Sequence, residues 1–415
     1  MNKCARIILN RVDVCSFRGY YGSTTQRYEI RKEHKAMTSR ERVQAVLRRE
    51  IPDRVPMDLW GTDSRMSTEY YKKAAAYLKY EELGERIRPG STSEYEDYRI
   101  ADLIGSDFRH INIGKPDGFK SYTDENGNII DEWGVGRKWI GIHPSLTLHP
   151  LAEATLEELE HYPWPVMRDP GRVRGLAGRA KDWYENTDFA ITATSATSGT
   201  IFELCQYLRG IEQFLIDLYE APDFAHALIA KVTGLLIELN TFYLEAVGPY
   251  IEWIEFSSDF GAQNAHFLSP ALFEEFFMEP HKSLFSACKN TMPDVKIFLH
   301  SCGSVRLLMP QFIEMGVEIQ SALQPLAAGM DSAELKQAFG DRLIFHGGVD
   351  IQQALTGSLT DTEADVKKRI DSFARDGGYI LSPSNHFQVD VPLENFFRMY
   401  EFGREYGVYP IGESK

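Results

Sequence analysis

The second half of the chain alternates between two patterns of hydrophobic and polar positions. Short runs such as residues 189–195, 295–303 and 342–350 are almost continuously apolar. Each is followed by a longer stretch in which apolar residues recur every three or four positions. The short runs predict strands buried on both faces, and the longer stretches predict amphipathic helices. Alternating strands and helices indicate parallel β/α units.

At least six such units can be counted, and a closed (β/α)8 TIM barrel fits them best. A doubly wound open sheet is the alternative. The predicted strands are residues 54–61, 189–195, 249–261, 295–303, 317–323, 342–350 and 377–387. The predicted helices are residues 39–49, 200–220, a helix starting near 269, and residues 305–315, 332–339, 361–375 and 392–406. Asn126-Gly127 between extended flanks predicts a β-hairpin, a small N-terminal excursion from the single barrel domain.

Composition narrows the class of protein. Of 415 residues, 43% are hydrophobic and 25% are charged, as in a soluble globular protein. No uninterrupted apolar stretch approaches 18 residues, so we expect no membrane association. The formal charge of −15 argues against nucleic-acid binding, which requires a basic face. Five cysteines without paired spacing indicate free thiols in the reducing cytoplasm.

The first 36 residues differ from the rest, with eight basic and three acidic side chains. We expect a poorly ordered N-terminal extension over 1–36 and the barrel over 37–410. One hypothesis is that translation begins at Met37. Lys32-Glu33 can be encoded by a purine-rich stretch that resembles a bacterial ribosome-binding site.

Polar side chains collect where the predicted strands end. They are Ser195 to Ser198, Asp259, His300, Cys302, Gln320, Gln324, His346, Asp350, Ser384, Asn385 and His386. In a β/α barrel the carboxyl ends of all strands open on one face, and that face carries the chemistry. The sequence therefore predicts a functional site built from these side chains.

His300 and Cys302 lie two positions apart at a strand end, so their side chains point to the same side. Imidazole and thiolate together suit zinc. The alternative is a satisfied core histidine beside a buried thiol. A zinc site needs a third ligand, for which His386 is the best candidate. Asp259, Glu279 and His346 are further options, and His346 could equally hydrogen-bond across the barrel mouth.

Several segments together carry a resemblance to a known family. They are "MTSRERVQAVLRREIPDRVPMDLWG", "LRGIEQFLIDLYEAPDF", "SSDFGAQNAHFLSPALFEEFFMEPHKSLF", "IFLHSCGSV", "LIFHGGVDIQQAL" and "GGYILSPSNHFQVDVPLENFFRMYEFGREYG". From about Met37 to Gly407 the chain resembles the uroporphyrinogen decarboxylase superfamily. It looks closer to the corrinoid-linked methyltransferase branch than to the true decarboxylases. The decarboxylases carry an Arg-Gln-Ala-Gly-Arg stretch, where this chain reads "MDLWGTDSRM" with Arg65 alone.

The resemblance implies a (β/α)8 barrel and roles for particular residues. His300 and Cys302 match the first two zinc ligands of the thiol-alkylating members. Those members add a cysteine near the end of the last strand, which His386 would replace here, with Asn385 as a weaker substitute. The expected catalytic residues are Asp259, His346 and Asp350. The expected substrate-binding residues are Gln263, Gln324, Asn385 and Trp60.

The expected function is zinc-dependent methyl transfer between a methylated small molecule, thiol or pterin and a corrinoid protein, in the cytoplasm. Zinc is the expected cofactor, and the partner protein supplies the corrinoid. One alternative is a cofactor-free decarboxylase of a tetrapyrrole or other carboxylate. Another is a non-catalytic binder of corrinoid or porphyrin. An exposed barrel flank could pair with a second copy to form a homodimer.

Overall fold

The computed structural model describes residues 36–141 and 143–412. The expectations for the extension over 1–36 therefore fall, apart from Ala36, outside the described residues.

Seven parallel strands form the main sheet, and they are arranged almost in the order of the sequence. The order across the sheet is β13-β12-β11-β10-β9-β8-β3. The strands are β3 (Phe108–Ile111), β8 (Ala190–Ala193), β9 (Trp253–Ser257), β10 (Lys296–His300), β11 (Ile319–Ser321), β12 (Ile344–Val349) and β13 (Tyr379–Pro383). Six of them lie inside the predicted strand segments, and all six predicted strand–helix units are present.

Residues 55–58 close this curled sheet into a barrel. On one side, Leu381 of β13 donates its amide N–H to the carbonyl of Pro56 at 2.9 Å, and Asp58 donates to the carbonyl of Leu381 at 3.0 Å. On the other side, Asp107 next to β3 donates to the carbonyl of Met57 at 2.9 Å. The segment thus takes the position of the eighth strand, between the first and last strands of the sheet. The predicted (β/α)8 barrel is confirmed.

Helix α1 (Ser39–Leu47) closes the amino-terminal end of the barrel. Its apolar side chains join a buried cluster with residues from the early positions of the strands. The cluster consists of Val43, Val46, Leu47, Phe108, Ala190, Trp253, Phe298, Ile319, Ile344 and Ile380. Asp107 ties the helix to the closing segment, because it accepts hydrogen bonds from Arg42 at 2.6 Å and from Arg54 at 2.8 Å. The amino-terminal end is therefore packed, and access to the interior is left to the opposite end.

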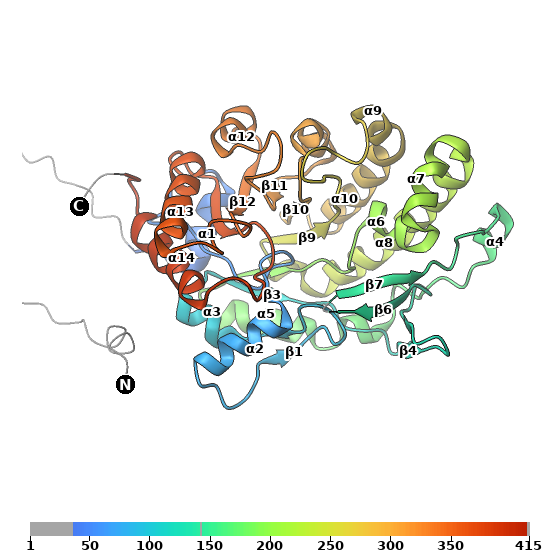
Figure 1. The fold of residues 1–415 in the computed structure, drawn as a ribbon, viewed down its shortest axis with the longest axis horizontal. Coiled ribbons are helices and arrows are strands. Elements are labelled where there is room, and N and C mark those ends of the chain that lie inside the picture. Colours follow the sequence, from blue (N-terminus) through green and yellow to red (C-terminus); the bar gives the residue numbers. More distant parts are fainter. Residues whose placement is uncertain (1–35, 142, 413–415) are drawn as a thin grey trace, which may run out of the picture. The chain divides into compact units, whose positions relative to one another are not determined.

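The other helices surround the strands (Figure 1). They are α2 (Thr68–Tyr77), α3 (Tyr98–Ile104), α4 (Leu156–His161), α5 (Leu176–Asn186), α6 (Ile201–Arg209), α7 (Ile211–Glu220), α8 (Pro222–Val247), α9 (Pro270–Phe273), α10 (Glu279–Thr291), α11 (Met309–Met315), α12 (Ser332–Phe339), α13 (Leu359–Phe373) and α14 (Leu393–Tyr406). The prediction for 332–339 matches α12 at both ends. The predicted helix 200–220 is divided at Gly210 into α6 and α7.

Two small antiparallel sheets depart from the barrel. One pairs β1 (Glu85–Arg86) with β2 (Tyr95–Glu96). The other has four strands in the order β4 (Tyr122–Thr123), β5 (Ile129–Ile130), β6 (Gly136–Ile140) and β7 (His143–Leu148). In Figure 1 β6 and β7 run out beyond the barrel strands, toward α4. The hairpin predicted at Asn126-Gly127 is the β4–β5 turn, and Gly127 has a φ of 81° there. The excursion is larger than expected, because β6 and β7 extend it.

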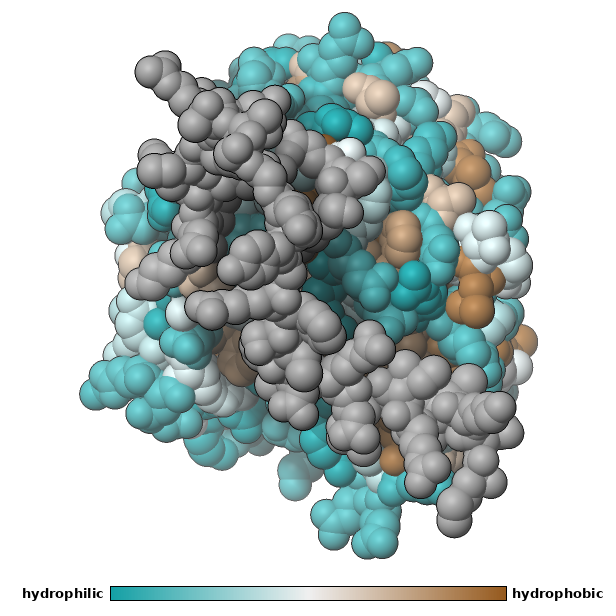
Figure 2. All heavy atoms as spheres, turned by 90° about the vertical axis from the view of Figure 1, so that its left-hand side faces the viewer, coloured by the Kyte–Doolittle hydropathy of each residue, from teal (hydrophilic) through white to brown (hydrophobic). Residues whose placement is uncertain are grey.

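Helix α8 is the one described segment that by length and composition could cross a membrane. Its range continues to Tyr250, and half of its most apolar window is buried inside the protein. Such burial is typical of a core helix of a globular protein. On the face drawn in Figure 2, the coloured side chains are mostly hydrophilic, and hydrophobic ones are scattered between them.

Candidate metal centre and barrel-mouth cavity

A layer of buried polar side chains lies inside the barrel above the apolar cluster at its base. Asp58 stands between two histidines, with one carboxylate oxygen 2.8 Å from Nε2 of His110 and the other 2.9 Å from Nε2 of His346. Thr192 and Glu255 complete this layer around His110. Burial opposes a charge on His110, but Asp58 and Glu255 outweigh burial and raise its pKa to about 10. The layer is a hydrogen-bonded ionic network rather than an apolar core.

Asp63 connects this network with the end of β10. Its Oδ2 atom lies 3.2 Å from Nδ1 of His300 and accepts a short hydrogen bond from Ser321. The same oxygen lies 3.8 Å from Nδ1 of His346. Burial opposes ionisation of Asp63, but the histidine charges and these hydrogen bonds lower its pKa to about 2. A charged carboxylate therefore faces one side of the His300 ring.

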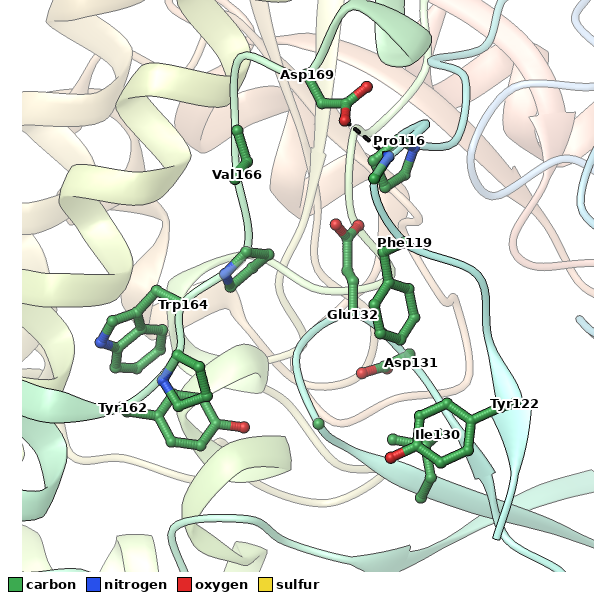
Figure 3. A pocket seen from close by; sticks show the side chains of 14 residues that line it. Pro116, Phe119, Tyr122, Ile130, Asp131, Glu132, Tyr162, Trp164, Val166 and Asp169 are labelled. Carbon is green, nitrogen blue, oxygen red and sulfur yellow. Dashed lines mark hydrogen bonds between the residues drawn. The ribbon is translucent and has the colours of Figure 1, made fainter.

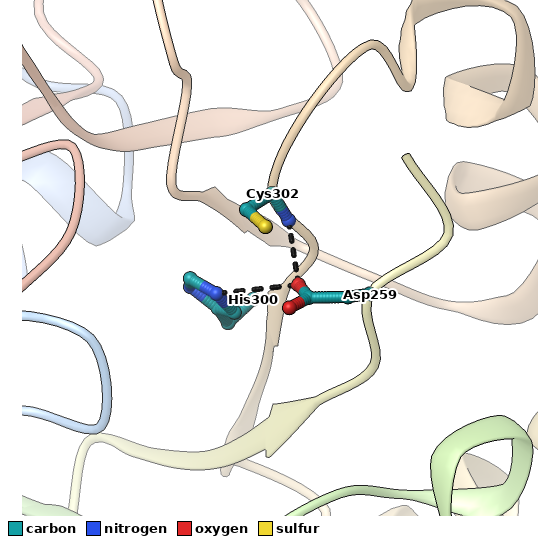
Figure 4. A group of neighbouring side chains, drawn as sticks. All are labelled: Asp259, His300 and Cys302. Atoms are coloured by element: carbon teal, nitrogen blue, oxygen red, sulfur yellow. Dashed lines mark hydrogen bonds and ion pairs between the residues drawn. The ribbon is translucent and has the colours of Figure 1, made fainter. Parts of the chain in front are cut away.

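The other side of the His300 ring faces a compact group of three potential metal ligands. Asp259 follows β9, and its Oδ1 atom lies 3.4 Å from Nε2 of His300. Cys302 follows β10, and its amide N–H donates to the same Asp259 oxygen at 2.8 Å. One ligand atom from each of the three residues lies within 4.8 Å of the others (Figure 4). The side chains of two neighbouring strand ends thus meet at one point.

These three donors fit a zinc ion. Nitrogen, sulfur and oxygen donors around tetrahedral zinc are separated by about 3.3–3.6 Å, so the Asp259–His300 pair already has this spacing and the group as a whole would contract from separations of up to 4.8 Å. Asp63 on Nδ1 leaves Nε2 of His300 for a metal, which is the carboxylate–histidine arrangement common behind zinc ligands. Burial is the largest effect on Cys302 and raises the pKa of its thiol. A bound cation would reverse that effect, because metal coordination deprotonates a thiol.

The candidate site borders a cavity of about 620 Å³ at the carboxyl ends of the strands. Asp63, Asp259 and His300 form part of its wall. The side chains of Ile129 and Trp139, from the four-stranded sheet, contribute apolar surface to the same cavity. The cavity is large enough for a small organic molecule.

Glu203 of α6 also lines this cavity. Its Oε1 atom accepts a hydrogen bond from Tyr207 at 3.2 Å, while its buried Oε2 atom has no hydrogen-bond partner among the described residues. Burial, followed by the nearby charge of Asp259, raises the pKa of Glu203 well above its usual value. The wall near Asp259 thus holds a carboxyl group that favours its neutral form.

His386, the predicted third ligand, lines the cavity but does not join the three-residue group. Its Nε2 atom lies 2.9 Å from the carbonyl oxygen of Thr62, so this nitrogen carries the proton and donates it. Burial lowers the pKa of His386 to about 4. Asn385 also lines the cavity, and its side-chain oxygen accepts the amide N–H of His386 at 2.7 Å. Asp259 takes the position in the group that the sequence had favoured for His386.

The side chains of the two predicted glutamines form hydrogen bonds with backbone groups. Gln263 donates from its side chain to the carbonyl of Leu326 at 2.7 Å. Gln324 accepts the amide N–H of Gly303 at 2.8 Å, which holds the turn that follows Cys302. Neither glutamine lines the cavity.

Three further predicted residues lie away from the cavity. Trp60 is fully buried and donates its indole N–H to the carbonyl of Asp97 at 3.2 Å. His346 belongs to the buried ionic network, where it hydrogen-bonds Asp58 as the sequence alternative anticipated. Asp350 accepts amide N–H groups from Gln352 at 2.9 Å and from the two residues after it, so it holds a turn.

A second pocket of about 360 Å³ lies beside the four-stranded sheet (Figure 3). Aromatic side chains dominate its walls, namely Phe119, Tyr122, Tyr162 and Trp164. Two acidic residues of this pocket are already neutralised, because Asp131 pairs with Arg137 and Glu132 with Arg172. The metal-ligand group lies outside this pocket.

Sequence reasoning missed the acidic residues that support the site. Asp58 and Asp63 lie in or just after a predicted strand, and His110 lies in a segment for which no strand was predicted. A charged residue within an otherwise apolar strand was the available signal. Their mutual contacts join segments more than 40 residues apart, so only the folded chain reveals the network.

The fold and the site together define a (β/α)8 barrel protein with a candidate metal centre at the carboxyl ends of its strands. Residues 151–406 match the family model described as uroporphyrinogen decarboxylase (URO-D). This match spans more than half of the chain, and the protein belongs to the uroporphyrinogen decarboxylase family.

Curated relatives carry the name of that family. Uroporphyrinogen decarboxylase 2, chloroplastic, from Arabidopsis thaliana is 27% identical over 197 residues, which cover 45% of this chain and 44% of the relative. The chloroplastic uroporphyrinogen decarboxylase of Zea mays is 28% identical over 162 residues, covering 37% of this chain and 39% of the relative. The chain thus spans less than half the length of these two relatives.

A solved structure resembles nearly the whole fold. A methyltransferase from Methanosarcina mazei superposes with a TM-score of 0.62 at 17% identity, covering 89% of this chain and 99% of that chain. At this identity the similarity shows the shared fold.

Proposed function

We propose that the protein is a zinc-dependent methyltransferase that moves a methyl group between a methylated small molecule, thiol or pterin and a corrinoid protein in the cytoplasm. The observation that carries this proposal is the group of Asp259, His300 and Cys302 beside the cavity. Three protein ligands are the usual number for a catalytic zinc site, because one position stays open for substrate.

The residues around the site divide into ligands and supports. Nε2 of His300, the thiolate of Cys302 and a carboxylate oxygen of Asp259 would hold the metal. When bound, zinc supplies a Lewis acid that polarises the heteroatom of a methylated substrate or activates a thiol. Asp63 orients His300 through Nδ1, and the Gln324 side chain fixes the turn after Cys302.

The fold supports the same proposal. The structural neighbour from Methanosarcina mazei is described as a methyltransferase, and it matches this chain over almost its full length. The corrinoid would come with a partner protein docking at the open, carboxyl-terminal end of the barrel, since α1 fills the other end.

Decarboxylation is the second candidate, because the curated relatives are named uroporphyrinogen decarboxylases. The charges in the cavity argue against a substrate with many carboxylates. Among the basic residues of its wall, Arg137 and Arg172 are already paired with Asp131 and Glu132. Asp63 and Asp259 add negative charge where the substrate would lie. Among the described residues, Arg88 and Lys115 are the arginine and lysine of this wall that have no ion pair, and two cations are few for a substrate with many carboxylates.

Metal analysis tests the proposal most directly. We expect near-stoichiometric zinc in the purified parent protein and in His386→Ala, and its loss in Cys302→Ser and Asp259→Asn. Plasma mass spectrometry after removal of any tag measures this. Loss of zinc in His386→Ala with retention in Asp259→Asn would instead assign the third ligand to His386. A parent protein without zinc, purified with zinc in the medium, would refute the metal-dependent function.

Activity then distinguishes the two candidates. The zinc-loaded protein is incubated with reduced cobalamin and a panel of methoxylated aromatics and methylamines, and methylcobalamin is followed by absorbance. The matched assay follows loss of carboxyl groups from uroporphyrinogen with a chelator present. Methylcobalamin formation that disappears in Cys302→Ser supports methyl transfer, whereas decarboxylation unaffected by the chelator supports the second candidate.

A further inference from the structure

The loop between β1 and β2 places an arginine in the wall of the cavity, and hydrogen bonds hold the backbone of this loop. Arg88 lines the cavity that also exposes His300 and Asp259. Its amide N–H donates to the carbonyl of Glu94 at 3.1 Å, and its own carbonyl accepts the amide N–H of Ser91 at 3.1 Å. Ser93 in the same loop donates to the carbonyl of Met66 at 2.6 Å, which ties the loop to the barrel mouth. The backbone position of Arg88 is thus fixed.

The guanidinium of Arg88 makes no hydrogen bond or ion pair with any residue that the structure describes, unlike the other arginines of this region. Arg86, two positions earlier, pairs with Glu94 at 2.6 Å. Arg65, in the barrel mouth, pairs with Glu96 at 3.0 Å and donates to Asn112 at 2.8 Å. The contrast matters because Arg88 is half-buried at the cavity wall and keeps its five N–H donors available for a ligand.

The acidic groups near Arg88 do not neutralise its positive charge. Glu96 is the acidic group that attracts it, but the two oxygens of Glu96 already accept from Arg65, Asn112 and Tyr98. Burial, followed by the charge of Arg65, lowers the pKa of Arg88 to about 10. At neutral pH the side chain remains protonated, and an incoming anion would supply the charge partner that Glu96 does not.

The rest of the cavity wall shows what kind of anion fits. Ile87, Ile129 and Trp139 supply an apolar surface, and Asp259 and His300 belong to the same wall. A planar carboxylate matches the paired N–H groups of a guanidinium. We propose that Arg88 binds the carboxylate of a small methylated substrate whose apolar body lies along this surface. The methyl-bearing end would face the group of Asp259, His300 and Cys302. The orientation of the methyl-bearing end rests on the proposed function, whereas the carboxylate site does not.

Calorimetry with matched probes tests the carboxylate site. 3-Methoxybenzoate and the neutral 3-methoxybenzyl alcohol are similar in size, and inorganic phosphate serves as a second anion. We expect the parent to bind the benzoate at least tenfold more tightly than the alcohol. Arg88→Gln should weaken benzoate binding by about 10- to 100-fold, the range for a charge-assisted pair, and leave the alcohol unchanged. Arg86→Gln, which removes a neighbouring exposed arginine, should leave both affinities unchanged.

Other results would overturn the proposal. Equal affinity for benzoate and alcohol, no benzoate binding by the parent, or an Arg88→Gln affinity equal to that of the parent would each do so. Phosphate binding that is tighter than benzoate binding and is lost in Arg88→Gln would assign the site to phosphoryl groups instead. Thermal melting of each variant shows that it is folded.

The same titration on Cys302→Ser separates this inference from the proposed function. Benzoate binding that persists in this variant, together with a parent that holds no zinc, would refute metal-dependent methyl transfer and leave the carboxylate site standing. A zinc-containing parent that methylates cobalamin but does not discriminate benzoate from the alcohol would refute the carboxylate site and leave methyl transfer standing.

Discussion

At the scale of single residues, Asp63 is the link between the barrel interior and the candidate metal centre. One of its carboxylate oxygens accepts hydrogen bonds from His300 and Ser321 and lies close to His346. Removing its charge would leave the His300 ring without the partner that fixes its Nδ1 proton. The orientation of the potential ligand therefore depends on a residue that touches no metal.

Asp63→Asn should consequently weaken zinc binding by about 10- to 100-fold, the usual effect of losing the hydrogen-bonded partner behind a ligand. Competition with a chromophoric chelator measures the affinity. Asp350→Asn is the matched control, because Asp350 is also a buried acid but holds a separate turn. Equal zinc affinity in the two variants would contradict the role of Asp63.

His110 predicts how stability depends on pH. Its pKa of about 10 in the folded protein lies above the value of about 6.5 expected for an unfolded chain. The stabilisation from its charge is therefore complete below about pH 6.5 and is lost as the pH rises through about 10, by up to about 1.4 kcal/mol per pH unit. Urea denaturation between pH 7 and 10 should show this decline, and His110→Gln should flatten it. An equally steep decline in His110→Gln would exclude His110 as its source.

At the scale of secondary-structure elements, α1 stabilises the barrel by filling its amino-terminal end. Val46 is fully buried in the cluster that α1 shares with the strands. Val46→Ala should lower the free energy of unfolding by about 2 kcal/mol through lost burial and a small cavity. Arg48→Ala on the exposed face of the helix end should change it by less than about 1 kcal/mol. Urea denaturation midpoints compare the two variants. Similar losses of unfolding free energy would show that the packing of α1 against the barrel end does not stabilise the protein.

The elements that the sequence predicted well are those with a strong local pattern. Strand β10 and helix α12 have clear apolar periods, and both lie within or on their predicted limits. Helix α8 was not predicted, although its buried side chains recur every three or four positions along its 26 residues. The predicted strand over 54–61 is not a regular strand: it has isolated bridges at Arg54 and Met57, and Trp60 turns the chain with a φ of 84°.

The candidate site was predictable to the extent that it depends on strand ends. His300 ends β10 and Cys302 follows it closely, and Asp259 follows the neighbouring strand β9, so barrel topology brings the three residues together. The position of His386 could not be predicted, because the contact of its ring with Thr62 depends on the loop after the closing segment. Asp63 lies in that same loop, and nothing local indicates that the loop reaches His300.

At the scale of the whole molecule, the candidate metal centre should couple ligand binding to stability. The ligands come from the ends of β9 and β10, which are central in the sheet. A metal bound only by the folded chain stabilises it, by about 4 kcal/mol when its concentration is 1,000 times the dissociation constant. Zinc should therefore raise the melting temperature of the parent and not that of Cys302→Ser. Calorimetric scans with zinc and with chelator measure this, and an equal zinc effect in both proteins would place the binding elsewhere.

The segment over 55–58 has a consequence for how the protein is made. Its partner Asp107 leaves the ribosome soon after it, but its other partner, Leu381, is synthesised much later. Until Leu381 emerges, the nascent chain holds an open sheet with two unpaired edges, which are sites for mispairing with other chains. Stalled chains that end before Tyr379 should be cleaved by protease near residues 54–61, whereas the released chain of 415 residues should resist. Biosynthesis of this barrel would then depend on chaperones until its last strand emerges.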